Sequence, residues 1–596
     1  MSAATAIHNV RIFDGIQALS RGTVVFQNGT ITAIGDERAI LHGARVIDGT
    51  GHTLLPGLID AHMHVLDRAN LQQALIFGIT TELDMFTDYR LAHAVKEQQA
   101  AGQGLDMADL RSAGTGVTAP GGHFTEYGLP IPTINGPDEA QEFVAARIVE
   151  GSDYIKIVYD DGRSMGRPFP TLSKETMAAV VRAAHQRGKL AIVHITTYQE
   201  ACDAIEVGVD ALAHLFVDEA PEPDFGRFVA KHHAFVIPTL TVLECATGIP
   251  SGASLVTDAR LVPYLTTGDI GQLEARFLVR SADSLPSYAV AREAVRQLKA
   301  ANVPLLAGTD APNGSTLHGA SLHRELELLV QAGLTPQEAL VAATSVPAAH
   351  FGLTDRGRIA IGLRADLLLV RGDPTSDITD TRDIAGVWKR GVAVDRQTYR
   401  EDIERQKVAA HSRPAPVGSA PGLVSDFEDG TMGTRFGSGW QTLADSEHGG
   451  SSSAELHVVP EGANGGKGSL LITGEVAAPS WTARAGAIFF PGSAPWEPAN
   501  LSSKKALTFW AKGDGKPYRV MLLVVGNPAM PPTVTFTAGA AWQRFHFAFA
   551  QFGSVDGSDL LGVLFTAGMI QGRFAFQIDD VRFLSGGNVR GTAETA

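Results

Sequence analysis

The chain has 596 residues, of which 44% are hydrophobic and 19% are charged, and its formal net charge is −15. This length is several times that of one ordinary domain, so we expect several globular domains. The negative charge argues against nucleic acid or an anionic membrane as the main partner.

Neither targeting signals nor disulfides are predicted. No apolar run reaches the roughly 20 residues that cross a bilayer, so we expect no membrane span. The start, Met1 to Ala6, lacks the charged and apolar regions of a signal peptide. The compartment stays open between the cytoplasm and export with a leader already removed. Cys202 and Cys245 are too few for a disulfide framework, and we interpret both as small buried residues.

The first 53 residues have the pattern of short strands and turns, with predicted strands at 6–13, 23–27, 30–35 and 45–48. Asn28-Gly29 between two alternating runs is a strong hairpin signal. These strands need partners, which we expect from strands after the central domain, at 357–361, 365–370 and 384–395. Residues 1–53 and 357–405 are therefore predicted to form one composite β-sandwich domain.

The segment that organises the chain is Leu55-Pro56-Gly57-Leu58-Ile59-Asp60-Ala61-His62-Met63-His64, predicted as a buried strand over 54–64. Strand side chains alternate between faces, so Asp60, His62 and His64 project to the same side. Two imidazoles spaced in this way can bind one cation. Two histidines satisfied by hydrogen bonds at a strand end are an equally good interpretation until other ligands are found.

Strands alternate with helical patterns over residues 54–356, which indicates an α/β domain. Eight such strands with intervening helices predict a (β/α)₈ TIM barrel, whose active site forms at the carboxyl ends of its strands. Helices are predicted over 173–187, 288–301, 317–332 and 336–344. The eight candidate strands are 54–64, 79–85, 109–115, 154–159, 190–196, 211–216, 235–240 and 304–308.

Further residues with ligand chemistry stand at the ends of these strands. Lys156 lies in the apolar run Tyr154-Ile155-Lys156-Ile157-Val158, where a buried ammonium is costly. Carbon dioxide could convert it to an anionic carbamate; a lysine that reaches solvent is the alternative. His194, His214 and Asp310 end the fifth, sixth and eighth strands. Any one of them could be incidental, but together with His62 and His64 they predict a metal centre.

These residues resemble the amidohydrolase superfamily, in the branch of imidazolonepropionases and prolidase-like dipeptidases. The resemblance covers roughly residues 7–395. The residues that carry it are Asp48, the segment Pro56–His64, Ile155-Lys156-Ile157, His194, His214, Gly308-Thr309-Asp310 and the tail Gly357-Arg358-Ile359 with Gly362-Leu363-Arg364-Ala365-Asp366-Leu367.

The resemblance implies that His62, His64 and Asp310 hold one metal and that His194 and His214 hold a second. Carboxylated Lys156 would bridge the two. Nitrogen and oxygen ligands suit Zn²⁺ best, with Mn²⁺, Co²⁺ or Fe²⁺ as alternatives. A metal-bound hydroxide would attack a carbonyl, with Asp310 as general base and acid. Asp60 is expected to support the ligands from the strand.

Two residues are weaker candidates for binding substrate. His123, in Gly121-Gly122-His123 after the third strand, resembles substrate-facing residues of the dipeptidase-like branch and is also assigned a catalytic role. A surface histidine is the alternative. Tyr159, three residues after Lys156, would hydrogen-bond substrate or simply pack.

The C-terminal part differs from the rest of the chain in its composition and sequence pattern. Residues 406–422 have the composition of a linker, and residues 423–590 predict an all-β sandwich of jelly-roll type. Asp426-Phe427-Glu428, the run 507–513 and the run 576–581 loosely resemble galactose-binding-like domains of carbohydrate-binding modules and complex I assembly factors. Glu428 and Asp580 are candidates for a structural Ca²⁺. Five of the six tryptophans fall here, and core packing is favoured over a glycan platform.

The leading hypothesis is a metal-dependent hydrolase that cleaves an amide, peptide or cyclic amide C–N bond of a small-molecule substrate. Ester, lactone or phosphotriester hydrolysis is the alternative with the same site, and deamination of a ring amine is less favoured. A different class is a glycan-binding protein with an inert barrel. The substrate and the oligomeric state, including a homo-oligomer, are left open.

Overall fold

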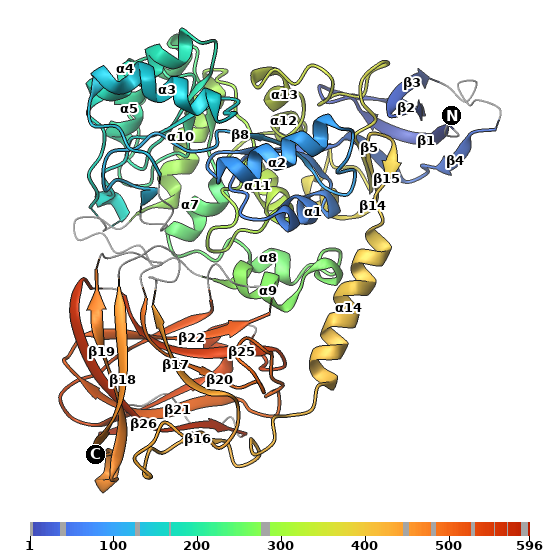
Figure 1. The fold of residues 1–596 in the computed structure, drawn as a ribbon. Helices are drawn as coiled ribbons and strands as arrows, with labels where there is room; N and C mark the ends of the chain where they lie inside the picture. Colours follow the sequence, from blue (N-terminus) through green and yellow to red (C-terminus); the bar gives the residue numbers. More distant parts are fainter. Residues whose placement is uncertain are drawn as a thin grey trace. The chain divides into compact units, whose positions relative to one another are not determined.

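The computed structural model describes residues 4–35, 43–125, 131–165, 168–275, 286–444, 452–477, 484–525, 531–553, 555–568, 570–585 and 594–595. The chain divides into two compact units, and Figure 1 labels their helices and strands. Unit 1 holds residues 1–124, 131–264 and 276–400, and unit 2 holds residues 125–130, 265–275 and 401–596.

One sheet of unit 1 combines strands from both ends of that unit. Its strands are ordered β15-β14-β13-β5-β1-β2-β3, and β4 also pairs with β1. The Asn28-Gly29 hairpin is confirmed, since Gln27 pairs with Thr30 across the turn. Hydrogen bonds from Ile31 N to the Leu363 carbonyl and from Gly362 N to the Ile31 carbonyl also join β3 to the segment before β13; the two-layered sandwich stays a prediction. The bounds are β1 Thr5–Phe13, β2 Ala18–Gln27, β3 Thr30–Gly35, β4 Arg45–Asp48, β5 His52–Pro56, β13 Leu367–Arg371, β14 Ile384–Lys389 and β15 Val392–Ala393.

The strand predicted over 54–64 is in fact two strands. β5 pairs with β13 in the composite sheet, whereas the next strand, β6, pairs with β7 in the central part of the unit. Gly57 stands at the break, where a Cβ atom would lie 2.3 Å from the side chain of Thr80. The close approach of the two segments explains why the apolar run changes sheet without any polar signal.

The central part of unit 1 contains seven parallel strands in two sheets. β6, β7 and β8 form one sheet, and β9 to β12 form the other. Isolated parallel bridges join Val117 to Ile157 and Val236 to Leu305, and another joins Met63 to Ala311. The segment 304–308 has only the single bridge from Leu305 to Val236, instead of the regular strand that was predicted. The bounds are β6 Leu58–Met63, β7 Ile79–Asp84, β8 Asp109–Ser112, β9 Ile155–Val158, β10 Ala191–His194, β11 Ala211–Ala213 and β12 Phe235–Ile237.

Helices lie between these strands along the chain. Side-chain caps begin two of the predicted helices: Ser173 caps α4, and Thr335 with Glu338 forms a capping box at the start of α12. Among helices of the described residues, none has the length and apolar character needed to cross a membrane. The α-helices of residues 1–400 are α1 Arg68–Ile76, α2 Tyr89–Ala100, α3 Ala140–Val149, α4 Lys174–His185, α5 Tyr198–Glu206, α6 Phe225–Lys231, α7 Leu240–Ala246, α8 Ala253–Val256, α9 Thr267–Glu274, α10 Tyr288–Ala300, α11 Ala320–Gln331, α12 Pro336–Ala342 and α13 Ser345–His350.

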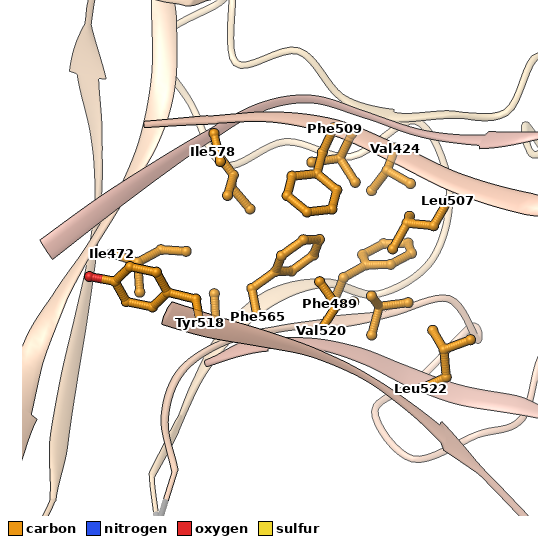
Figure 2. Packing of buried hydrophobic residues seen from close by; sticks show 14 of the residues in the cluster. Val424, Ile472, Phe489, Leu507, Phe509, Tyr518, Val520, Leu522, Phe565 and Ile578 are labelled. Atoms are coloured by element: carbon orange, nitrogen blue, oxygen red, sulfur yellow. The ribbon is translucent and has the colours of Figure 1, made fainter. Parts of the chain in front are cut away.

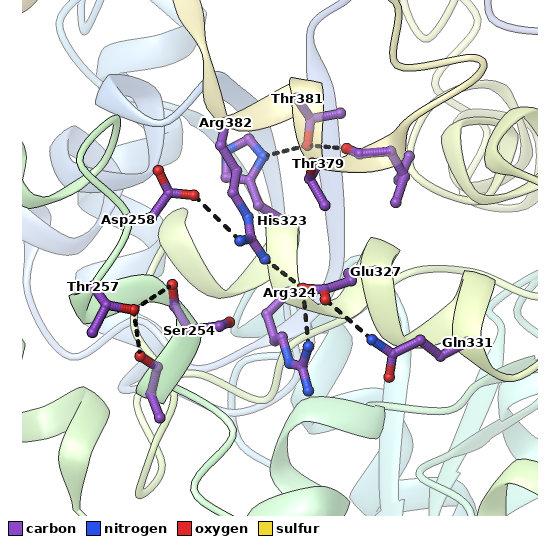
Figure 3. A network of polar contacts seen from close by, with 12 residues as sticks. Ser254, Thr257, Asp258, His323, Arg324, Glu327, Gln331, Thr379, Thr381 and Arg382 are labelled. Carbon is purple, nitrogen blue, oxygen red and sulfur yellow. Dashed lines mark hydrogen bonds and ion pairs between the residues drawn. The ribbon is translucent and has the colours of Figure 1, made fainter.

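A polar network holds α11 against neighbouring segments of unit 1 (Figure 3). Arg382, in the 3₁₀ turn Ile378–Arg382, lies 2.5 Å from Glu327 and 3.3 Å from Asp258. The His323 ring contacts the Thr381 hydroxyl at 3.0 Å and the Phe77 carbonyl at 3.0 Å. Because Arg382 and His323 are buried and paired, the network fixes the position of α11, whose buried Glu325 accepts hydrogen bonds from Leu240 N and Thr241 N.

Helix α14, Arg396–Ser412, extends into the segment predicted as a linker. Unit 2 then consists mainly of two antiparallel sheets, ordered β18-β19-β26-β21-β24-β27 with β16 beside β26, and β17-β20-β25-β22-β23. The bounds are β16 Leu423–Ser425, β17 Gly439–Ala444, β18 Ser453–Pro460, β19 Gly468–Val476, β20 Ala485–Phe490, β21 Ala506–Gly513, β22 Pro517–Val524, β23 Thr533–Thr537, β24 Gln543–Ala548, β25 Leu560–Ala567, β26 Gly572–Leu584 and β27 Glu594–Thr595.

The core of unit 2 lies between its two sheets (Figure 2). Leu507 and Phe509 of β21 face Phe565 of β25 and Val520 of β22, and all four are fully buried. Phe509 and Phe565 meet edge to face, with ring centroids 4.9 Å apart. Such a two-sheet core agrees with the predicted all-β domain.

The tryptophans of unit 2 divide between the core and the surface. Trp440 and Trp510 are each 7% exposed, whereas Trp496 is 54% exposed. Trp542 is half-buried, and Trp481 lies outside the described residues. Core packing therefore accounts for two of the five.

Candidate metal centre

The histidines of the organising segment lie beside Asp310. Asp310 Oδ1 is 3.3 Å from His62 Nε2 and 3.0 Å from His64 Nε2. The backbone brings the two segments together, because Asp310 N donates a 2.7 Å hydrogen bond to the His62 carbonyl. His62 is fully buried and Asp310 nearly so.

The remaining ligand candidates surround this pair. Lys156 Nζ lies 3.5 Å from His62 Nε2. The ring centroid of His214 is 4.5 Å from that of His62 and 4.6 Å from that of His194. Ligand atoms of His62, His214 and Asp310 lie within 4.8 Å of one another, close enough to share one ion. The structure thus brings all six predicted ligands into one cluster.

Two of the six have a left-handed backbone. His214 has φ 75° and Asp310 has φ 56°, a region that residues other than glycine rarely adopt. Such backbone strain is concentrated at functional sites, where the surrounding structure holds it in place. This conformation belongs to the residues that immediately follow β11 and the bridge segment 304–308.

Hydrogen bonds to the ring nitrogens select which nitrogen of each histidine is available. His64 Nδ1 donates to the Phe86 carbonyl at 3.1 Å, and His214 Nδ1 contacts the Thr239 hydroxyl at 2.7 Å. In both rings Nε2 therefore remains for a metal. His194 differs, because its Nε2 lies 3.4 Å from Asp160 Oδ2 without hydrogen-bond geometry, so no such bond among the described residues selects one of its ring nitrogens. Partners of this kind orient metal-binding imidazoles in general.

Asp60 links the segment that carries His62 to the segment that carries Asp310. Its carboxylate accepts hydrogen bonds from the backbone N–H groups of His62 and Thr309, both at 3.1 Å, and from the Thr309 hydroxyl at 2.7 Å. Burial raises the pKa of Asp60 to about 7. These contacts support the expectation that Asp60 positions the ligands.

Burial also determines the charge of the ligands. It lowers the pKa of His62 to about 3 and that of Lys156 to about 7, so the neutral imidazole and the neutral amine are both accessible. Burial alone would raise the pKa of Asp310, but the adjacent imidazoles, with His214 first, hold it well below its usual range. Neutral nitrogen donors beside an ionised carboxylate are the protonation states that a divalent cation needs.

The residues present fit a metal ion. His62 Nδ1, His194 Nε2 and Asp310 Oδ1 are buried polar atoms without a hydrogen-bond partner among the described residues. The contacts of Asp310 Oδ1 with the Nε2 atoms of His62 and His64, and of His194 Nε2 with Asp160, are ion-pair distances of 3.0–3.4 Å without hydrogen-bond geometry. Unsatisfied buried polar atoms are rare in native proteins and call for a missing partner.

The structure places the two substrate candidates differently. The ring centroid of His123 is 5.0 Å from that of His194 and 5.0 Å from that of Phe124. Tyr159 Oη instead donates a 3.0 Å hydrogen bond to Asp203 on α5. His123 therefore borders the cluster, while the Tyr159 hydroxyl is engaged with a helix.

Sequence reasoning missed Asp160 and Thr239, which contact ligand candidates, and Glu325, which binds the backbone just after Thr239. Asp160 follows β9 directly, so its place at a strand end could have identified it. Thr239 and Glu325 carried no such signal, because their contacts depend on the fold. Asp160, Asp161 and Glu200 also form a group of close carboxylates, but Glu200 serves there as the capping-box residue of α5.

The two carboxylates considered for calcium in unit 2 have protein partners. Glu428 accepts hydrogen bonds from Lys467 N at 2.9 and 3.0 Å, and Asp580 Oδ1 accepts one from Arg582 Nε at 2.6 Å. A structural Ca²⁺ at these residues stays a prediction.

Comparisons with known proteins agree with this geometry. The chain is 26% identical over 418 residues to imidazolonepropionase of Ralstonia nicotianae, covering 63% of this chain and 94% of that protein. It is 24% identical to adenine deaminase of Ligilactobacillus salivarius, covering 73% and 69%. A crystal structure of a Xaa-Pro dipeptidase with bound methionine superposes with a TM-score of 0.53 at 24% identity, covering 66% of this chain and 99% of that one, and this likeness shows the fold alone.

Family models match both parts of the chain. Residues 427–558 match the complex I intermediate-associated protein 30 (CIA30) family, which confirms the resemblance predicted for the C-terminal domain. Residues 53–394, more than half of the chain, match the amidohydrolase family, and they include all six ligand candidates. The chain therefore belongs to the amidohydrolase family, with a CIA30 domain at its C-terminus.

Proposed function

We propose that this protein is a metal-dependent hydrolase that cleaves a C–N bond in an amide, peptide or cyclic amide. The observation that carries the proposal is the position of Asp310, whose carboxylate oxygen lies between the Nε2 atoms of His62 and His64 within a cluster of six ligand-type side chains. Family membership and the imidazolonepropionase relative support the reaction class.

The protein framework of this proposal is a (β/α)₈ barrel over residues 54–356. Seven parallel strands, β6 to β12, and the bridged segment 304–308 would form the eight strand positions of the barrel. The composite domain of residues 1–53 and 357–405 would flank it, and a jelly-roll domain would occupy residues 423–590. The parallel pairing in chain order supports the barrel.

Two divalent cations fit the donor set. His62, His64 and Asp310 would hold one, His194 and His214 the other, and Lys156, once carboxylated, would contribute an oxygen to both. Imidazole nitrogens together with carboxylate and carbamate oxygens suit Zn²⁺, with Mn²⁺, Co²⁺ or Fe²⁺ as alternatives. When bound, such ions lower the pKa of water and polarise a carbonyl group.

Asp310 is the proposed proton carrier. Its carboxylate would take the proton of the attacking water and deliver it to the leaving nitrogen as the C–O bond forms and the C–N bond breaks. The left-handed backbone at Asp310 and the hydrogen bond from its N–H to the His62 carbonyl fix the carboxylate in place. His64, held through Nδ1 by the Phe86 carbonyl, keeps its other nitrogen toward Asp310.

Substrate contacts are proposed for the side of the cluster that carries His123. His123 would donate a hydrogen bond to the substrate carbonyl oxygen or bind another polar group of the substrate. Phe86 and Phe124 stack at 4.2 Å beside His64, and they would favour an apolar group next to the scissile bond. Tyr159 would act on substrate only after releasing Asp203.

Metal analysis and a substrate panel test this function. We expect about two divalent metal ions per chain by plasma mass spectrometry, and chelator-sensitive hydrolysis of N-acyl amino acids or dipeptides. Faster turnover of aryl esters, lactones or phosphotriesters would favour the alternative chemistry. Metal-free protein without hydrolase activity would contradict the proposal, and tight glycan binding by such a protein would favour the binding class.

A further inference from the structure

A cavity of about 610 Å³ lies against the composite sheet of unit 1. None of the six ligand candidates lines it. Its walls come from the β2–β3 hairpin, the β14–β15 turn and the segment after α2. The lining side chains that bear on its chemistry are Phe26, Leu105, Asp355, Arg364, Arg390 and Val392.

Two tight turns fix the rim of this cavity. Asn28 and Gly29 have φ 52° and 85°, and Arg390 and Gly391 have φ 48° and 74°. A Cβ atom on Gly391 would lie 3.4 Å from Gly29 Cα, so the two turns pack directly against each other. Arg390 is thereby held in a constrained backbone at the rim.

Behind the rim, the buried carboxylate of Asp109 forms ion pairs with several basic side chains. Asp109 lies 2.6 Å from both Arg356 and Arg364 and 2.8 Å from Lys389, whereas Arg390 is 3.9 Å away. Three strong ion pairs leave little capacity on this carboxylate for a fourth cation. Arg390 is therefore the side chain with the weakest pairing.

The local charges do not balance. Four basic side chains face three carboxylates, since Asp355 and Asp366 pair with the same arginines that bind Asp109. The guanidinium group of Arg390 makes no hydrogen bond to any described residue, and its Nε is buried without a partner. Its side chain is 33% exposed, so it is accessible from the cavity that it lines.

We propose that this cavity binds an organic carboxylate with an apolar body, through the guanidinium of Arg390. A carboxylate matches the planar donors of arginine and neutralises the surplus charge. Leu105 and Val392 supply the apolar surface for the remainder of the ligand. The site is distinct from the metal cluster and does not depend on the function proposed for it.

Isothermal titration calorimetry on the full chain tests this site with benzoate as the probe. We expect benzoate to bind at least about tenfold more tightly than its neutral analogue benzamide. Arg390→Gln should weaken benzoate binding by about tenfold or more, while Arg21→Gln, an exposed arginine on β2, should leave it unchanged. Val392→Trp, which fills the cavity and retains its charges, should also weaken binding.

The variants separate this cavity from the metal cluster. Benzoate bound at the metal cluster would be unaffected by Arg390→Gln and by Val392→Trp, and that result would overturn the proposal. Failure of benzoate to bind would also overturn it. Tighter binding of inorganic phosphate than of benzoate would contradict the assignment of an apolar acid. Circular dichroism of each variant verifies that a loss of binding is not a loss of fold.

Discussion

His214 and Thr239 are joined by a 2.7 Å contact between the imidazole Nδ1 and the threonine hydroxyl. Thr239 follows β12 in a left-handed backbone with φ 47°, and Glu325 holds the next two residues through their N–H groups. The orientation of a candidate metal ligand on one strand thus depends on the end of the next strand and on α11.

Thr239→Val should loosen metal binding without altering the ligands themselves. The variant keeps the shape of threonine but loses the hydroxyl that fixes His214, and loss of such a partner typically costs 10–100-fold in metal affinity. Chelator competition would measure this effect. Thr239→Ser retains the hydroxyl and should restore most of the affinity; equal affinity of the valine variant and the wild type would contradict the assigned role.

Asp310→Asn should retain metal yet lose most turnover. The amide occupies the same space but cannot take up a proton from water, and loss of a general base typically costs about 10²–10⁴-fold in rate. Metal content and kcat should be measured on the same preparation. A near wild-type rate would show that Asp310 is not the proton carrier.

Lys156 should carry a carbamate in the metal-loaded protein. Burial lowers the pKa of its amine to about 7, so an uncharged amine able to react with carbon dioxide is available near neutral pH. Loading with ¹³C-labelled bicarbonate should give a carbamate carbon signal by NMR, which Lys156→Gln abolishes. We expect that variant to bind about one metal ion per chain or fewer. Full loading with two ions in Lys156→Gln would contradict the bridging role.

Glu325 should make the stability of unit 1 depend on pH. Burial raises the pKa of its carboxyl from 4.5 to about 8, so the protonated form is favoured in the folded state. Its contribution is fully present below about pH 4.5 and is lost as the pH rises through about 8. Glu325→Gln cannot titrate, so the free energy of unfolding of the wild type minus that of the variant should fall by roughly 3–5 kcal/mol between pH 5 and 8.

Urea denaturation at both pH values measures this difference, in which the other titrating groups cancel. Glu293→Gln, an exposed residue that pairs with Arg296 on α10, should show no such trend. A difference that stays constant between pH 5 and 8 would contradict the prediction for Glu325.

Phe565→Ala should destabilise unit 2 by about 3–5 kcal/mol, because it removes a fully buried ring from the centre of the two-sheet core. Calorimetry of the full chain should show one transition at lower temperature. Metal content at 25 °C should not change, since Phe565 belongs to neither the metal cluster nor its support. A variant with an unaltered transition would show that the core lies elsewhere.

The strand ends that carry the six ligand candidates were predictable from sequence, because each pairs an apolar run with a polar residue at its carboxyl end. His62, His194 and Asp310 were found in this way. The break at Gly57 was missed, although the Pro56-Gly57 dipeptide within the apolar run is a breaker signal. Helix α14 extends into the predicted linker because the proline-rich composition begins only after Ser412.

The support around the ligands escaped sequence reasoning for a different reason. Asp160 and His194 are 34 residues apart in the sequence, and Thr239 and His214 are separated by a shorter stretch. Only the pairing of parallel strands brings the two members of each pair together. The charge imbalance around Arg390 likewise results from residues that are scattered along the chain. Hydrogen-bond partners between distant segments depend on the completed fold.

The pairing of β5 with β13 has a consequence for synthesis on the ribosome. Leu54 lies opposite Leu369. After β5 has been synthesised, more than three hundred further residues are therefore added before its pairing partner β13 exists. At about 5–20 residues per second this interval is roughly 15–60 s. During that time the edge of β5 is an open template for other strands. A nascent chain stalled before residue 367 should therefore recruit chaperones, and one released after residue 371 should not.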